Sequence, residues 1–158
     1  MVRIAIFVTI FLATLFYALR RGGGPERTMA LILIAMLLAD QLLHLFVPPR
    51  FSGVDLGHLL IDLIAAGATF AVAMTAHRFW PMPAAVLQFL PLMAHIGKAL
   101  DLSVHPVVYL TMQVAASWLL PPLLALATWR HQKRLRTNGS DRSWFLSWRS
   151  SNQRNASR

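Results

Sequence analysis

The sequence contains no cysteine, which excludes disulfides, thiolate metal sites, cysteine nucleophiles and CxxC redox motifs. Charged residues are also scarce: they make up 13% of the 158 residues, against about 25% in an ordinary soluble domain. Hydrophobic residues make up 56%, above the level of about 45–50% that is typical of such a domain. These proportions exclude a water-soluble globular domain.

The sequence also lacks the short motifs of common enzyme classes. It has no GxGxxG, no phosphate-binding loop, no HExxH and no GxSxG. Nothing in it therefore points positively to catalysis, and the interpretation leans away from an enzyme.

Long apolar runs are the main feature that is present. A helix that crosses a bilayer needs about 20 mostly apolar residues. Five runs of about this size occur, at residues 4–19, 28–47, 55–76, 80–96 and 106–128. The short connections between them make consecutive helices antiparallel neighbours. The sequence thus predicts an all-α, polytopic integral membrane bundle of about five transmembrane helices over residues 1–129, followed by a basic, partly disordered cytoplasmic tail over residues 130–158.

The distribution of Lys and Arg predicts the orientation of this bundle. Short cytoplasmic loops carry an excess of positive charge. With the N-terminus outside, twelve basic residues lie inside and three outside, namely Arg3, Arg50 and Lys98. A signal peptide over the first run is the alternative, but no small-x-small cleavage site precedes Arg20. We expect an N-out, C-in protein.

The basic composition also bears on source and partners. The chain has thirteen Arg and two Lys, a bias typical of GC-rich bacterial genomes, so we expect a multi-pass protein of the bacterial inner membrane. The net charge of +9 is concentrated in the predicted cytoplasmic segments. This placement favours anionic lipid headgroups over nucleic acid as the partner. The predicted headgroup contacts follow the fifth run directly: Arg130, Lys133, Arg134 and Arg136.

Ionisable residues inside predicted spans are the default candidates for function, because burying them in lipid is costly. Asp40 and His44 are four residues apart, and His58 and Asp62 repeat this spacing in reverse order. Residues four apart share one face of a helix. Because the second and third runs form an antiparallel hairpin, we expect the two pairs to face each other on the outer side. Small residues continue the face of Asp62 and predict that it points inward: Ala65, Ala66, Thr69 and Ala73.

Carboxylate and imidazole groups in this arrangement could hold a divalent first-row metal or carry protons. The spacing resembles the intramembrane metal site of cation diffusion facilitators, which also use carboxylate and histidine ligands four apart on two helices. The resemblance covers only the four residues Asp40, His44, His58 and Asp62. The chain has neither the six spans nor the soluble metal-sensing domain of that family. The alternative is that the same side chains only form hydrogen bonds between helices.

Other polar residues cluster on the same predicted outer side: Asp55, His95, Lys98, Asp101 and His105. Paired histidines could ligate a b-type haem, but the carboxylates beside them make haem less attractive than a metal ion, and no cofactor is predicted outright. Two interpretations follow. The first is a small accessory or assembly protein of the membrane without chemistry of its own, which contacts lipid and another membrane protein. The second is a protein that handles a cation, a metal or a proton through the outer Asp/His cluster.

Overall fold

The computed structural model describes residues 2–46, 56–100 and 106–145, and within these ranges the chain is all-α. It forms five helices: α1 (Val2–Arg21), α2 (Gly24–Phe46), α3 (Leu56–Thr75), α4 (Pro81–Ala99) and α5 (Pro106–Asn138). Each helix coincides with one of the five apolar runs to within a few residues, except at the end of α5. The helices begin and end where the sequence places glycine, proline and charge.

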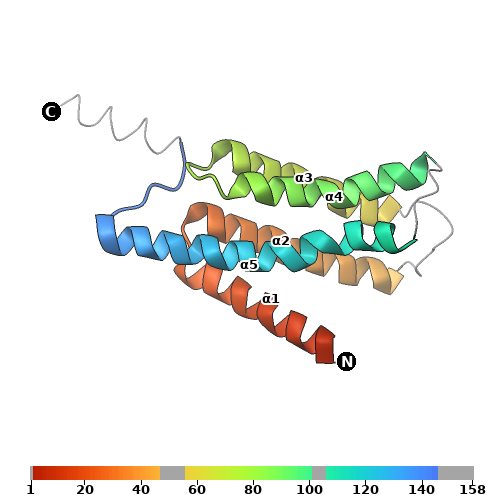
Figure 1. The fold of residues 1–158 in the computed structure, drawn as a ribbon, viewed down its shortest axis with the longest axis horizontal. Helices are drawn as coiled ribbons and strands as arrows, with labels where there is room; N and C mark the ends of the chain where they lie inside the picture. Colours follow the sequence, from red (N-terminus) through yellow and green to blue (C-terminus); the bar gives the residue numbers. More distant parts are fainter. Residues whose placement is uncertain (1, 47–55, 101–105, 146–158) are drawn as a thin grey trace.

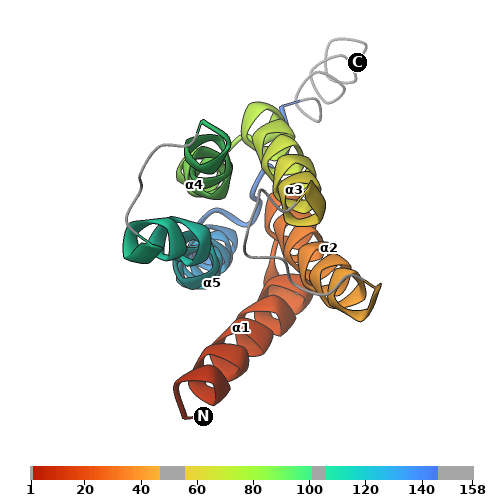
Figure 2. The same ribbon diagram turned by 90° about the vertical axis from the view of Figure 1, so that its right-hand side faces the viewer.

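The helices run up and down along one long axis (Figure 1). Seen end-on, α2 and α3 form one layer and α4 and α5 a second, while α1 packs against α2 and α5 and splays outward toward its N-terminus (Figure 2). We name the two ends by their residues. The basic end contains residues 20–27, 76–81 and 129–145, and the histidine end carries His44, His58 and His95.

Three of the described helices contain segments long and apolar enough to cross a membrane: Ile4–Arg21, Gly24–Phe46 and Leu56–Thr75. Their outward faces carry large apolar side chains that remain exposed, such as Leu31, Ile64 and Phe70. An apolar surface of this extent is unfavourable in water and is expected against lipid. These apolar helices indicate a membrane protein. The other two predicted spans, residues 80–96 and 106–128, also lie in helices apart from Trp80, which directly precedes α4.

Small side chains allow the helices to approach closely in the interior. The face of α3 predicted to point inward does so, since Ala65, Ala66, Thr69 and Ala73 are buried. The largest buried cluster joins α1, α2, α4 and α5 and is made mostly of alanine and leucine. In lipid such close packing replaces the hydrophobic effect as the main source of helix association.

The α5 helix differs from the expectation, because it continues ten residues beyond the predicted span, to Asn138. Residues 130–136 are Arg, His, Gln, Lys and Leu, and all but His are good helix formers. Arg136 lies in the last turn, where a positive charge interacts favourably with the helix dipole. The helix ends at Gly139, whose φ of 69° is the left-handed conformation that favours glycine. The first part of the predicted tail is therefore ordered helix.

Candidate functional site

The antiparallel α2–α3 hairpin brings Asp40, His44 and His58 together at the histidine end. Asp40 Oδ1 lies 3.2 Å from His58 Nε2 and 3.7 Å from His44 Nδ1. The two imidazole rings meet edge to face with centroids 5.2 Å apart. One potential ligand atom from each residue lies within 4.8 Å of the other two. These three side chains therefore form a candidate metal centre.

The spacing of these atoms can be compared with that of real metal ligands. Nitrogen and oxygen ligands lie about 2.0–2.2 Å from Zn²⁺, so in tetrahedral geometry they are about 3.4 Å from one another. The distance from Asp40 Oδ1 to His58 Nε2, 3.2 Å, is close to this value. The residues present thus fit a metal with three protein ligands and an open fourth position, the pattern of sites that exchange a ligand.

His44 makes a second contact, which bears on which of its two ring nitrogens is available to a metal. Its Nδ1 lies 2.8 Å from the backbone carbonyl oxygen of Asp40. In the tautomer that donates this hydrogen bond, the lone pair is on Nε2. Metal-binding histidines commonly use one nitrogen for the metal and donate from the other to a carbonyl or carboxylate. Ligation through Nε2 preserves the hydrogen bond, whereas ligation through Nδ1 would break it.

The three side chains are also accessible. Their exposed fractions are 38% for Asp40, 43% for His44 and 31% for His58. The protein itself therefore does not enclose the three side chains.

Asp62 lies one helical turn from His58 but has a different partner. Its Oδ2 is 3.2 Å from His95 Nε2 on α4, and the side chain of His95 is only 2% exposed. The four sequence-predicted residues thus divide into a three-residue cluster between α2 and α3 and a separate Asp62–His95 pair between α3 and α4. Asp62 is not part of the candidate metal centre.

A pocket of about 340 Å³ connects the two groups. Its polar lining consists of Asp40, His58, Asp62, Gln88 and Ser117, and the rest of its wall is apolar, with Phe7 and Phe11 on the α1 side. The side chain of Gln88 is buried and donates a hydrogen bond to the sulfur of Met36. The pocket places the two carboxylates on one shared cavity inside the bundle.

The remaining predicted site residues are placed as follows. Lys98 is half-buried in the last turn of α4. Asp55, Asp101 and His105 lie outside the described residues. The four predicted headgroup contacts, Arg130, Lys133, Arg134 and Arg136, all lie on the extension of α5 at the basic end.

The basic end contains a buried ionic network that the sequence analysis did not identify. Arg78, between α3 and α4, has its Nη1 3.2 Å from Glu26 Oε1 and 3.0 Å from Asp141 Oδ2. The side chains of Arg78 and Glu26 are 3% and 0% exposed. The indole of Trp80 donates a hydrogen bond to Glu26 Oε1, at 3.0 Å. One arginine therefore links the start of α2 to the segment that follows α5.

Two residues of α5 complete this network at Asp141. His131 Nδ1 and Arg134 Nε lie 2.6 and 3.1 Å from Asp141 Oδ2. Burial alone would raise the pKa of Asp141, but the hydrogen bonds from His131 and Arg134 and the charge of Arg78 outweigh it and hold the pKa below its ordinary value. The carboxylate is therefore kept ionised.

The segment after α5 is fixed by backbone contacts as well. Trp144 forms an antiparallel bridge with Ala76, and the Ser143 hydroxyl accepts a hydrogen bond from the backbone N–H of Gly24 at 3.3 Å. A Cβ on Gly24 would collide with the Trp144 indole. One feature of the sequence could have pointed to this ionic network: Glu26 is the only glutamate of the chain and stands beside a predicted span.

Comparison with known proteins adds no further identification, since no family model, curated protein or solved structure matches the chain. The candidate metal centre and the ionic network are thus interpreted from their own chemistry.

Proposed function

We propose that this chain is a small polytopic membrane protein that binds a divalent first-row transition metal at the histidine end, through Asp40, His44 and His58. The observation that carries the proposal is the convergence of three ligand atoms from two helices within 4.8 Å. Neutral imidazole and carboxylate together suit zinc and its neighbours in the first transition row. The Asp62–His95 pair and the shared pocket provide a second acceptor for a cation or a proton deeper in the bundle.

The proposed setting is the bacterial inner membrane, with five spans, the N-terminus outside and the C-terminus inside. Its support is the charge distribution, because the basic end collects most of the Lys and Arg and cytoplasmic loops retain positive charge. Reporter fusions after Lys133 and within residues 50–54 are expected to report opposite sides of the membrane. Fusions that report the same side would contradict five spans.

The metal proposal is tested by titrating the chelator-washed protein in neutral detergent with Zn²⁺, using isothermal titration calorimetry. We expect one Zn²⁺ per chain. Loss of a residue that only hydrogen-bonds to a metal ligand typically weakens metal affinity about 10–100-fold. Loss of a direct ligand is expected to weaken it at least as much. His44→Ala and Asp40→Asn are therefore expected to weaken binding by tenfold or more.

Two variants serve as matched controls. His77→Ala removes an exposed histidine at the basic end, and Asp62→Asn removes the carboxylate that pairs with His95. Both are expected to bind Zn²⁺ as the unchanged protein does. If Asp62→Asn weakens binding as much as Asp40→Asn, the metal is held at the deeper pair instead. If the unchanged protein binds no Zn²⁺, the proposed metal centre is wrong.

A specific observation also favours the accessory or assembly interpretation as the second candidate. Asp40–His58 and Asp62–His95 each join two neighbouring helices, as expected of side chains that only fix helix packing. Under this interpretation His44→Ala leaves metal content unchanged, and Asp40→Asn lowers thermal stability without any effect on metal. The same titration, combined with a thermal unfolding measurement, separates the two candidates.

A further inference from the structure

The outer surface of the basic end has a pocket of about 490 Å³ between α1 and α5. Six residues line it: Tyr17, Arg21, Trp129, Gln132, Lys133 and Arg136. Three of the six, Arg21, Lys133 and Arg136, carry a positive charge, and none is acidic. This surface therefore attracts an anion, with no nearby lining carboxylate to oppose it.

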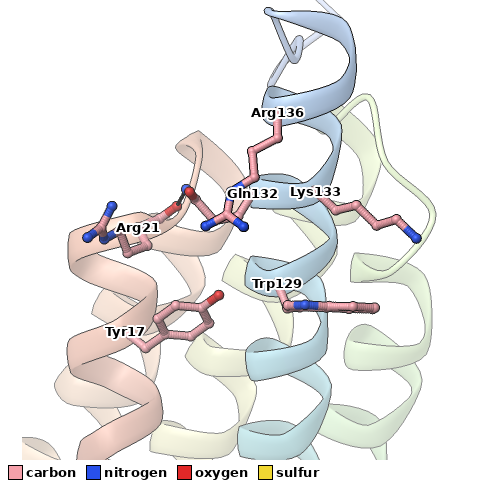
Figure 3. Close-up of a pocket in the computed structure, with 6 residues that line it drawn as sticks. All are labelled: Tyr17, Arg21, Trp129, Gln132, Lys133 and Arg136. Carbon is pink, nitrogen blue, oxygen red and sulfur yellow. Dashed lines mark hydrogen bonds between the residues drawn. The ribbon is translucent and has the colours of Figure 1, made fainter.

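The arrangement of these side chains is shown in Figure 3. Tyr17 and Arg136 project into the gap between the two helices, and Gln132 lies beside the end of α1. Lys133 and Trp129 extend together from α5, with the Lys133 ammonium 5.7 Å from the centre of the Trp129 ring. The Arg21 guanidinium points outward at the α1 rim. Arg136 and the Tyr17 hydroxyl are thus the donors that face the gap, whereas Lys133 extends from α5 on the side away from α1.

A hydrogen bond joins the two helices beside the gap. The side-chain amide of Gln132 donates to the backbone carbonyl of Arg21. Arg130 and Arg134 are the other two predicted headgroup contacts on α5. Arg134 is paired with Asp141, since its Nε lies 3.1 Å from Asp141 Oδ2. Arg130 is exposed but does not line the pocket. The structure therefore distinguishes Lys133 and Arg136 from their two basic neighbours.

We propose that this pocket is a site for one anionic phospholipid, whose phosphate is held by Arg136 and the Tyr17 hydroxyl, with Lys133 adding positive charge at the rim. A guanidinium binds phosphate oxygens through paired, charge-assisted hydrogen bonds. Tyr17 and Trp129 are the ring types that occupy the headgroup level of membranes. Toward the middle of the bundle the same two helices expose Phe16 and Leu126, which are 61% and 44% exposed, and these offer acyl chains an apolar surface. A phosphate with attached chains fits this combination better than a free phosphate ion does.

The test is native mass spectrometry of the full chain in neutral detergent, with phosphatidylglycerol or phosphatidylcholine added in increasing amounts. We expect one phosphatidylglycerol per chain to be retained at concentrations where phosphatidylcholine is not. Arg136→Gln and Lys133→Gln are each expected to weaken this retention about fivefold, the effect of one basic residue near an anionic surface. Arg130→Gln removes the same charge from an exposed position on the same helix and is expected to have no effect.

Three results would overturn the proposal. If phosphatidylglycerol and phosphatidylcholine are retained equally, the phosphate that both headgroups share, or the acyl chains, is sufficient for binding. The pocket then does not select an anionic lipid. Equal weakening by Arg130→Gln and Arg136→Gln would show that net charge alone attracts lipid. Displacement of the lipid by the same concentration of inorganic phosphate would assign the pocket to a free anion. Because the pocket lies at the opposite end from Asp40, His44 and His58, His44→Ala is expected to retain lipid normally, so failure of the metal proposal is seen separately.

Discussion

Arg78→Ala removes the cation that contacts both Glu26 and Asp141 at the basic end. Glu26 is fully buried, and after the substitution it keeps the Trp80 indole as a donor but loses the charge that balances it. Removing one partner of a buried ion pair costs about 3–5 kcal/mol. Because Asp141 retains His131 and Arg134, we expect the lower part of this range, about 3 kcal/mol.

The free energy of unfolding is measured by titrating the protein in mixed micelles with sodium dodecyl sulfate and following helix content by circular dichroism. Arg142→Ala is the matched control, since it removes an exposed arginine from the same region; such surface changes stay within about 0.5 kcal/mol. Glu26→Gln in the Arg78→Ala background removes the uncompensated charge and is expected to restore part of the loss. If Arg78→Ala destabilises the protein no more than Arg142→Ala does, the buried network is not present in the folded protein.

Two further predictions concern the pH dependence of the stability that Asp141 contributes and the substitution of Gly22 and Gly67 by alanine. The lowered pKa of Asp141 means that its contribution to stability is fully present above its ordinary value of 3.8 and is lost as the pH falls through the still lower pKa of the folded state. The difference in unfolding free energy between the unchanged protein and Asp141→Asn should therefore be constant near neutral pH and shrink below about pH 4; a constant difference down to pH 2 would contradict the assigned contacts. Gly22→Ala is expected to destabilise, because its Cβ would meet the Ala18 carbonyl and lie 2.7 Å from the Glu26 Cβ. Gly67→Ala, with nothing within 4 Å of the new Cβ, should be neutral or stabilise the helix by up to about 1 kcal/mol in the same titration. Equal effects of the two glycine substitutions would show that the close approach at Gly22 is absent.

The positions of the helices could be predicted from the sequence, because each apolar run is bounded by residues that end a helix. Gly22 and Gly23 separate α1 from α2, and Pro81 opens α4. The inward face of α3 was also predictable, since small residues recur on one side of it. The length of α5 could not be predicted from hydrophobicity, because basic residues with high helix propensity continue the helix beyond the apolar run of residues 106–128.

The candidate metal centre was predictable in part. A spacing of four places Asp40 and His44 on one face, and the short connection to α3 brings His58 near them. The partner of Asp62 was not predictable, because the rotation of α4 about its axis decides whether His95 faces α3. That rotation depends on the packing of all five helices, and no local pattern encodes it.

The two ends of the bundle differ in what balances their carboxylates, and this difference supports the separate structural and binding roles that we propose. At the basic end Glu26 and Asp141 both pair with Arg78, and Asp141 also contacts Arg134 and His131. Arginine remains charged at every accessible pH and offers no lone pair, so Arg78 can hold these segments together but cannot act as a metal ligand. At the histidine end Asp40 and Asp62 are paired with imidazoles, which in their neutral form supply a lone pair to a metal and in their charged form carry a proton. The carboxylates at the basic end therefore belong to the buried ionic network. None of them lines the outer pocket of Arg21, Lys133 and Arg136, where we propose that an anionic lipid binds. The carboxylates at the histidine end have imidazole partners, and Asp40 and its two histidines are the groups that we propose bind a cation together.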